Sequence, residues 1–123
     1  MAASDYIKTR NHYTGLSADD LCQCRYCKTY MKGIRSAAPE AADLLETLGA
    51  DIEKPFEVLP LYEDGTAMVY SGAQYIVFGK KEDFTEISDD VLSVFITGDH
   101  PPFEADDEYY VIELQFNGLL KMC

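Results

Sequence analysis

The sequence lacks tryptophan and holds two histidines among its 123 residues. No apolar run approaches the roughly 20 residues that span a bilayer, and the opening residues MAASDYIKTR contain no apolar core of a signal peptide. Internal repeats, low-complexity tracts, glycine-rich phosphate loops and EF-hand ligand spacings are missing as well. These absences argue against membrane, secreted, repeat and P-loop proteins. They predict a cytoplasmic location, where thiols stay reduced.

Basic residues are also scarce, with 10 against 22 acidic residues and a net charge of −12. The imbalance is uneven: residues 1–38 hold six basic and three acidic residues, whereas residues 39–123 hold four and nineteen. This charge disfavours nonspecific binding to nucleic acid or to an anionic membrane surface. Two interpretations of the acidity remain open, a surface that keeps the protein soluble and an acidic mimic that binds a basic protein partner.

The length fits one domain, and hydrophobic residues make up 47% of the chain, enough for one core. We expect a single domain over residues 1–123, mainly helical over 1–49 and mainly β over 56–123. Because helices precede strands in this pattern, the sequence predicts an α+β fold with two N-terminal helices packed on an antiparallel sheet of about four strands.

The first predicted helix covers residues 18 to 36, with Ser17 as its N-cap. Its apolar positions recur at the spacing of one helix face, at Cys27, Tyr30, Met31 and Ile34. The second predicted helix begins at Pro39, which suits a first helical position, and Gly49 is its natural C-cap.

The β pattern begins at residue 56. The segment 56–62 contains Pro60, so it is predicted to be an edge strand or no strand. Segments 66–70 and 74–79 are strand-like and are joined by a turn or bulge at Gly72. Segment 91–97 is nearly all apolar, as expected of a central strand, and segment 109–116 alternates and ends in a turn at residues 117–118.

Three cysteines lie within six positions, at Cys22, Cys24 and Cys27. On a regular helix Cys24 and Cys27 share a face, whereas Cys22 points about 140–160° away. All three can therefore bind one ion only if the chain is irregular from Cys22 to Cys24 and the helix starts near Cys24. Thiolates favour zinc, which takes four ligands, and His12 or Cys123 would be the fourth.

The segment CRYC also resembles the CPYC active site of glutaredoxins. In that interpretation Cys24 and Cys27 form a redox pair, and Arg25 and Lys28 favour their thiolates. The apolar strand that precedes the motif in that fold is missing here. A third interpretation makes the cysteines packing residues, which explains Cys27 well and Cys22 least.

Four basic residues of the first predicted helix fall within about 80° of one another on the helical wheel. This basic stripe consists of Arg25, Lys28, Lys32 and Arg35. It either lies along the protein's own acidic part or forms a docking face for an acidic partner.

Residues 22–80 resemble a family of small, acidic, uncharacterised bacterial proteins. The family pattern is a Cys-x-Cys-x-Tyr-Cys start, a Pro-Glu-x-Ala helix and a Leu-Gly-x-Asp-x-x-Lys-Pro-x-Glu segment. The matching residues here are Cys22, Cys24, Tyr26, Cys27, Pro39, Glu40, Ala42, Leu48, Gly49, Asp51, Lys54, Pro55 and Glu57. The resemblance implies an intracellular domain of one kind and carries no activity, cofactor or catalytic residue.

The sequence thus predicts a noncatalytic binding or interaction module, with a zinc site at the cysteines and a possible protein partner. The alternatives are a thiol-dependent redox enzyme using Cys24 and Cys27, and an acidic mimic. The sequence assigns no catalytic residue and leaves the oligomeric state open.

Overall fold

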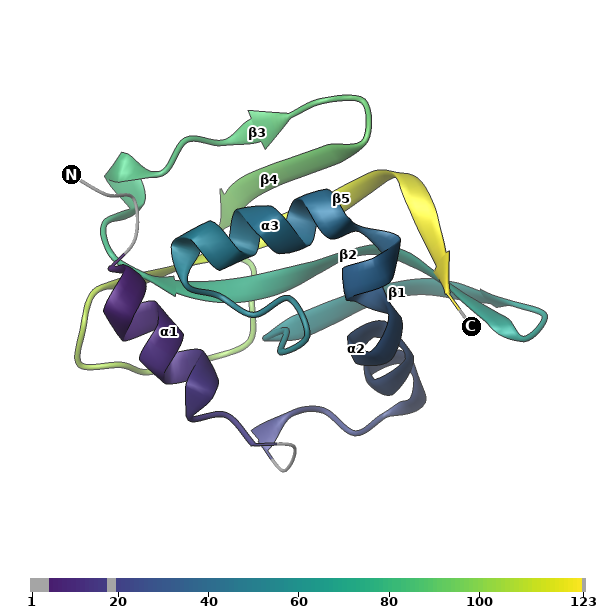
Figure 1. Cartoon of the computed structure of the whole chain (residues 1–123), viewed down its shortest axis with the longest axis horizontal. Coiled ribbons are helices and arrows are strands. Elements are labelled where there is room, and N and C mark those ends of the chain that lie inside the picture. Colours follow the sequence, from purple (N-terminus) through teal and green to yellow (C-terminus); the bar gives the residue numbers. More distant parts are fainter. Residues whose placement is uncertain (1–4, 18–19, 123) are drawn as a thin grey trace.

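A computed structural model describes residues 5–17 and 20–122 of the chain. In these residues three α-helices lie against an antiparallel sheet of five strands in the order β1-β2-β5-β4-β3 (Figure 1). The elements are α1 Tyr6–Thr14, α2 Arg25–Ala37, α3 Pro39–Leu48, β1 Glu57–Asp64, β2 Ala67–Phe78, β3 Ile87–Ser88, β4 Leu92–Thr97 and β5 Tyr109–Met122.

The α+β class is confirmed, but the prediction of two helices and about four strands is wrong. The additional helix, α1, has no apolar stripe in its sequence, so the helical period gives no signal there. Its position is set by distant contacts: the Tyr13 hydroxyl donates to the Ile76 carbonyl at 2.7 Å, and the Phe78 amide donates to Thr9 Oγ1 at 3.1 Å. A 3-10 turn, Lys81–Asp83, follows β2, so the helical residues are not all N-terminal.

Helix α2 begins seven positions later than the sequence pattern suggests. Residues 18 and 19, where the helix was expected to start, lie outside the described part of the chain. Ser17 and Asp20 instead hydrogen bond to each other: the Ser17 amide donates to the Asp20 carboxylate at 2.9 Å, and the Asp20 amide donates to the Ser17 carbonyl at 3.0 Å. Helix α3 is confirmed from Pro39 to the residue before Gly49, whose φ of 89° is the left-handed conformation of a C-cap.

Of the two alternatives predicted at Gly72, the bulge is confirmed and the turn is wrong, since β2 is one continuous strand with a shift in its pairing. Its pairing with β5 shifts between Tyr70 and Gly72, so the side of the strand that faces the helices changes from even to odd residues there. Tyr70 before the shift and Tyr75 after it are both fully buried in the core. Gly72 permits close approach of the strands, since a Cβ built on it would lie 2.0 Å from the Leu114 carbonyl oxygen.

Strand β5 continues to Met122 and does not end in a turn at residues 117–118, as the sequence suggested. It pairs with β2 up to Gln115, leaves it over residues 116–119, and returns at Leu120 opposite Tyr70. We call residues 116–119 the β5 excursion. Within it Leu119 has a φ of 54°, a left-handed conformation that is uncommon for a leucine.

Strand β1 lies at one edge of the sheet, and β4 lies near the other edge. Strand β1 is an edge strand, and its pairing with β2 is irregular at Pro60, as that residue predicts. Strand β4 is not central: it lies second from the opposite edge, next to the two-residue strand β3.

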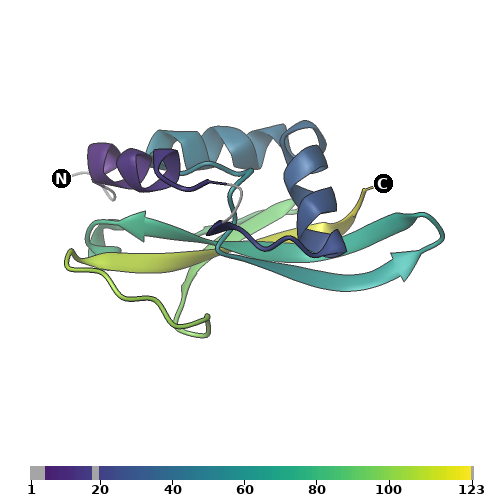
Figure 2. The same ribbon diagram turned by 90° about the horizontal axis from the view of Figure 1, so that it is seen from below.

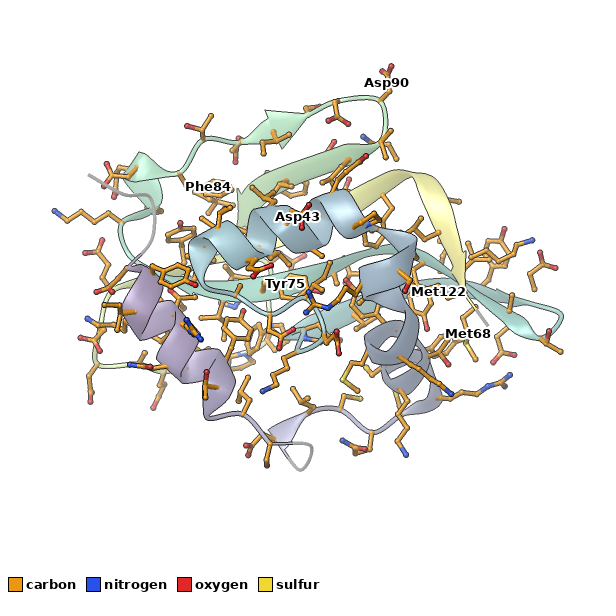
Figure 3. The ribbon with its side chains drawn as sticks, in the orientation of Figure 1. Asp43, Met68, Tyr75, Phe84, Asp90 and Met122 are labelled. Atoms are coloured by element: carbon orange, nitrogen blue, oxygen red, sulfur yellow. The ribbon has the colours of Figure 1, made fainter. Side chains whose placement is uncertain are left out.

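The three helices cover one face of the sheet (Figure 2). Core residues from both layers meet there, and the hydroxyl of Tyr75, beneath α3 in Figure 3, donates to the Ile52 carbonyl at 2.7 Å and lies 2.6 Å from the Tyr30 hydroxyl oxygen. A smaller apolar cluster on Ile76, Phe78 and Val111 includes Phe103 from the loop between β4 and β5. No helix of the described residues is long and apolar enough to cross a membrane.

Candidate metal centre

The three clustered cysteines meet at the start of α2. Their Sγ atoms all lie within 4.8 Å of one another. Cys22 and Cys24 are exposed, whereas Cys27 is buried, with 6% of its surface accessible. The structure therefore brings together, at one point, three soft ligands that a straight helix would separate.

The irregular chain before α2 makes this arrangement possible. Cys24 is the N-cap of the helix, with extended backbone angles of −69° and 163°. Its Sγ accepts a hydrogen bond from the Cys27 amide at 3.4 Å, and its carbonyl accepts from the Lys28 amide at 2.9 Å. Because Cys22 precedes this cap, its side chain is released from the helical angle that would direct it away.

The same cap creates different environments for two of the thiols. The pKa of Cys24 is lowered, chiefly because the Cys27 amide donates to its sulfur and also because Cys22 lies beside it. The pKa of Cys27 is raised, chiefly by burial and then by the neighbouring sulfurs of Cys22 and Cys24. The partial positive charge at a helix N-terminus favours a thiolate at the capping position.

The spacing of the sulfurs suits a metal ion. With Zn–S bonds of about 2.3 Å, sulfurs at tetrahedral positions lie about 3.8 Å apart, so the cluster needs to contract by no more than about 1 Å. Rotation about the side-chain bonds of the two exposed cysteines can supply this contraction. Three thiolates leave one position of a tetrahedral ion for another donor.

Of the two candidates for the fourth ligand, the structure describes His12 and does not describe Cys123. His12 is not part of the three-sulfur cluster: its ring packs edge-on against Phe78 and Phe103, with centroids 5.4 and 5.8 Å away. Burial lowers the pKa of His12, which favours the neutral imidazole that binds metals. His12 and Cys22 line a common cavity of about 280 Å³. Cys123 lies outside the described residues.

Sequence reasoning missed the apolar wall beside the thiols. Pro55 and Phe56 line the cavity shared by His12 and Cys22, and they also line a second cavity of about 150 Å³ next to Cys22 and Cys27. Nothing in the local sequence connects residues 55–56 with a cysteine thirty positions away. The tertiary fold alone places them there.

The basic stripe on α2 divides into paired and unpaired residues. Arg25 forms an ion pair with Glu63 of β1 at 3.1 Å. Arg35 pairs with Asp51 at 3.1 Å and also with Glu53. Among residues 5–17 and 20–122, no ion pair involves the two middle residues of the stripe, Lys28 and Lys32.

We expect charge reversal at Arg35, which forms two ion pairs, to lower stability more than reversal of the two middle lysines. Arg35→Glu should lower the free energy of unfolding by about 1–2 kcal/mol, because two exposed pairs are lost and replaced by repulsion. This loss should shrink in high salt, which already screens the native attraction. Thermal melts followed by circular dichroism measure both effects.

The matched variant is Lys28→Glu combined with Lys32→Glu, which should change stability by no more than about 0.5 kcal/mol. An equal loss in the two variants would show that the middle lysines also hold α2 against the acidic part of the protein. The docking face for an acidic partner stays a prediction for Lys28 and Lys32.

Comparison with known proteins finds no matching family model, curated protein or solved structure. The proposals below therefore rest on the geometry and chemistry of this chain.

Proposed function

We propose that this protein is a noncatalytic binding module that holds one zinc ion on Cys22, Cys24 and Cys27. The observation that supports the proposal is the approach of three sulfurs to within 4.8 Å at a helix N-terminus. Thiolates select zinc over the hard ions magnesium and calcium. A fourth donor completes the site, and His12 and Cys123 are the residues to test for it.

Zinc at this site would fasten the chain before α2 to the helix itself. The segment from Leu21 to Cys24 has no regular secondary structure. A metal bond from Cys22 to the sulfurs of Cys24 and Cys27 would supply a strong link where backbone hydrogen bonding is sparse. The ion would thereby contribute to folding stability, as structural zinc does in small domains.

Native mass spectrometry of untagged protein from zinc-supplemented medium tests the proposal. We expect one zinc per chain, lost on treatment with a chelator, and no zinc on a variant with serine at all three clustered cysteines. Separate His12→Ala and Cys123→Ser variants identify the fourth donor by a weakened but measurable zinc signal. A stoichiometry near zero, with every thiol of the fresh protein titrating as free, would overturn the proposal.

One observation points to a second candidate function, dithiol redox chemistry, which the fold does not support. Cys24 is exposed with a lowered pKa, and Cys27, three residues later, is buried with a raised pKa. A reactive dithiol combines an accessible thiolate with a protected partner in this way. The fold differs from that of thioredoxin-like enzymes, since within the described residues no strand leads into α2 and every pairing of the sheet is antiparallel.

We expect no disulfide-reductase activity from the purified protein, because the strand that positions such a dithiol is replaced by irregular chain. An insulin-reduction assay with dithiothreitol as electron donor measures this, with Cys24→Ser as the matched control. Turnover above the uncatalysed rate that disappears in Cys24→Ser would identify the protein as a thiol enzyme.

A further inference from the structure

A groove lies at the opposite end of α2 from the thiols. It has a volume of about 260 Å³ and lies between the corner joining α2 and α3, the turn joining β3 and β4, and the β5 excursion. Since α2 has 13 residues, the groove and the thiols are roughly 20 Å apart along the helix. The groove is therefore independent of the proposed zinc site.

The floor and walls of the groove are largely apolar. Leu92 and Phe116 are buried and line it from β4 and β5, and Ala41 lines it from α3. Its volume is below the roughly 300–1,000 Å³ of pockets that enclose small-molecule ligands. It suits one or two large apolar side chains of a peptide segment.

Two large apolar residues stand exposed at the rim. Val91 is 65% exposed and Leu119 is 43% exposed, and both line the groove. The turn that carries Val91 is well fastened: the Val91 amide donates to Asp89 Oδ1 at 2.8 Å, and the Val91 carbonyl accepts from the Asn117 amide at 2.9 Å. Leu119 is held in its left-handed conformation, which costs free energy that an exposed leucine does not recover by burial.

The charged residues that line the groove are all acidic. Glu40 at the start of α3 lines the groove, and so does Asp90, which lies at the tip of the β3–β4 turn in Figure 3. Asp43 lies one turn further along α3 and is exposed. Among the described residues no lysine, arginine or histidine lines the groove. A second copy of this chain, also carrying −12, would be repelled as a whole.

We propose that this groove docks a basic amphipathic segment of a partner protein, whose apolar side chains enter between Val91 and Leu119 and whose lysine or arginine residues face Glu40 and Asp90. Docking would cover the two exposed apolar side chains. The acidic rim would attract such a segment and exclude acidic ones, so that charge sets the specificity and apolar contact supplies the affinity.

A fluorescein-labelled peptide made of lysine and leucine, with leucines spaced three and four residues apart, is a direct probe. Fluorescence anisotropy at about 0.15 M ionic strength measures its affinity. The control peptide has the same lysines, with glutamine in place of every leucine. We expect the control peptide to bind at least about tenfold more weakly.

Matched variants locate the binding surface. Leu119→Asn combined with Val91→Ser should weaken binding of the leucine peptide about tenfold, and asparagine tolerates the left-handed conformation at position 119. Leu61→Asn, which removes a 49% exposed leucine from β1, should leave the affinity unchanged. Thermal melts check that each variant is folded.

A second pair of variants tests the contribution of the acidic rim. The two variants have the same net charge, since each removes two carboxylates. Glu40→Gln with Asp90→Asn should weaken binding at least about threefold, whereas Glu104→Gln with Asp106→Asn, in the exposed loop between β4 and β5, should not. Equal losses from both pairs would reduce the binding to nonspecific attraction and overturn the proposal. Unchanged affinity in the Leu119 and Val91 variant would overturn it too. So would sedimentation showing a dimer that this variant abolishes, since a second copy would then be the occupant.

Discussion

Replacing Gly72 with alanine is expected to destabilise the protein more than any other change proposed here. The new Cβ would lie 2.0 Å from the Leu114 carbonyl oxygen and 3.4 Å from the Gln115 Cα, so it would meet the backbone of β5. Backbone in the middle of a sheet cannot move aside without breaking the pairing of β2 with β5. We expect a loss of about 4 kcal/mol or more, a large share of the roughly 5–15 kcal/mol that holds such a domain folded.

Urea denaturation followed by far-ultraviolet circular dichroism measures this loss, and no tryptophan is present to serve as a fluorescent probe. Gly98→Ala is the matched control, because a Cβ at that position meets nothing within 4 Å. It should change stability by no more than about 0.5 kcal/mol. Similar denaturation midpoints for the two variants would contradict the close approach of β2 and β5 at Gly72.

The second large effect is expected on zinc affinity. Cys27→Ser replaces the buried thiol that we propose as a zinc ligand with a hydroxyl, which binds zinc poorly at neutral pH. We expect the zinc dissociation constant to rise at least about 100-fold, since even outer-shell substitutions at metal sites cost about 10–100-fold. Competition with a zinc-binding dye measures the constant.

The pH dependence of zinc binding provides an independent measurement on the same site. Cys27, with its raised pKa, is protonated at neutral pH when the site is empty, so zinc must displace that proton. Cys24, with its lowered pKa, loses its proton at lower pH than Cys27 does and contributes less to the dependence. We therefore expect affinity to increase as pH rises through neutrality, with at least about one proton released per zinc. Affinity that does not change with pH would contradict binding through Cys27.

Several features of this protein follow from the sequence because their causes are local. Helix α3 begins at Pro39 and ends before Gly49, since the fixed φ of proline and the left-handed freedom of glycine act within one turn. The alternation predicted for residues 109–116 is confirmed: the main core contains Tyr110, Ile112, Leu114 and Phe116, whereas Val111 belongs to the smaller cluster. The condition for grouping three thiols, an irregular chain before a helix starting near Cys24, also follows from helix geometry alone.

Other features depend on contacts between residues far apart in the chain. Helix α1 exists without an apolar stripe because Thr9 and Tyr13 hydrogen bond to β2, more than sixty positions away. The shift in β2 and the β5 excursion depend on how two strands fit side by side, which a single strand's pattern does not contain.

For the candidate sites the division is the same. The sequence by itself determined the acidic charge, the presence of the three thiols, helix α3 and the alternating strand at residues 109–116. Composition, spacing and capping are properties of neighbouring residues. Only the tertiary structure decided that Cys22 turns toward Cys24 and Cys27, that His12 lies against Phe78 and Phe103, and that Val91 and Leu119 flank one groove. These positions follow from packing of the whole chain, in which each contact depends on the placement of several elements at once.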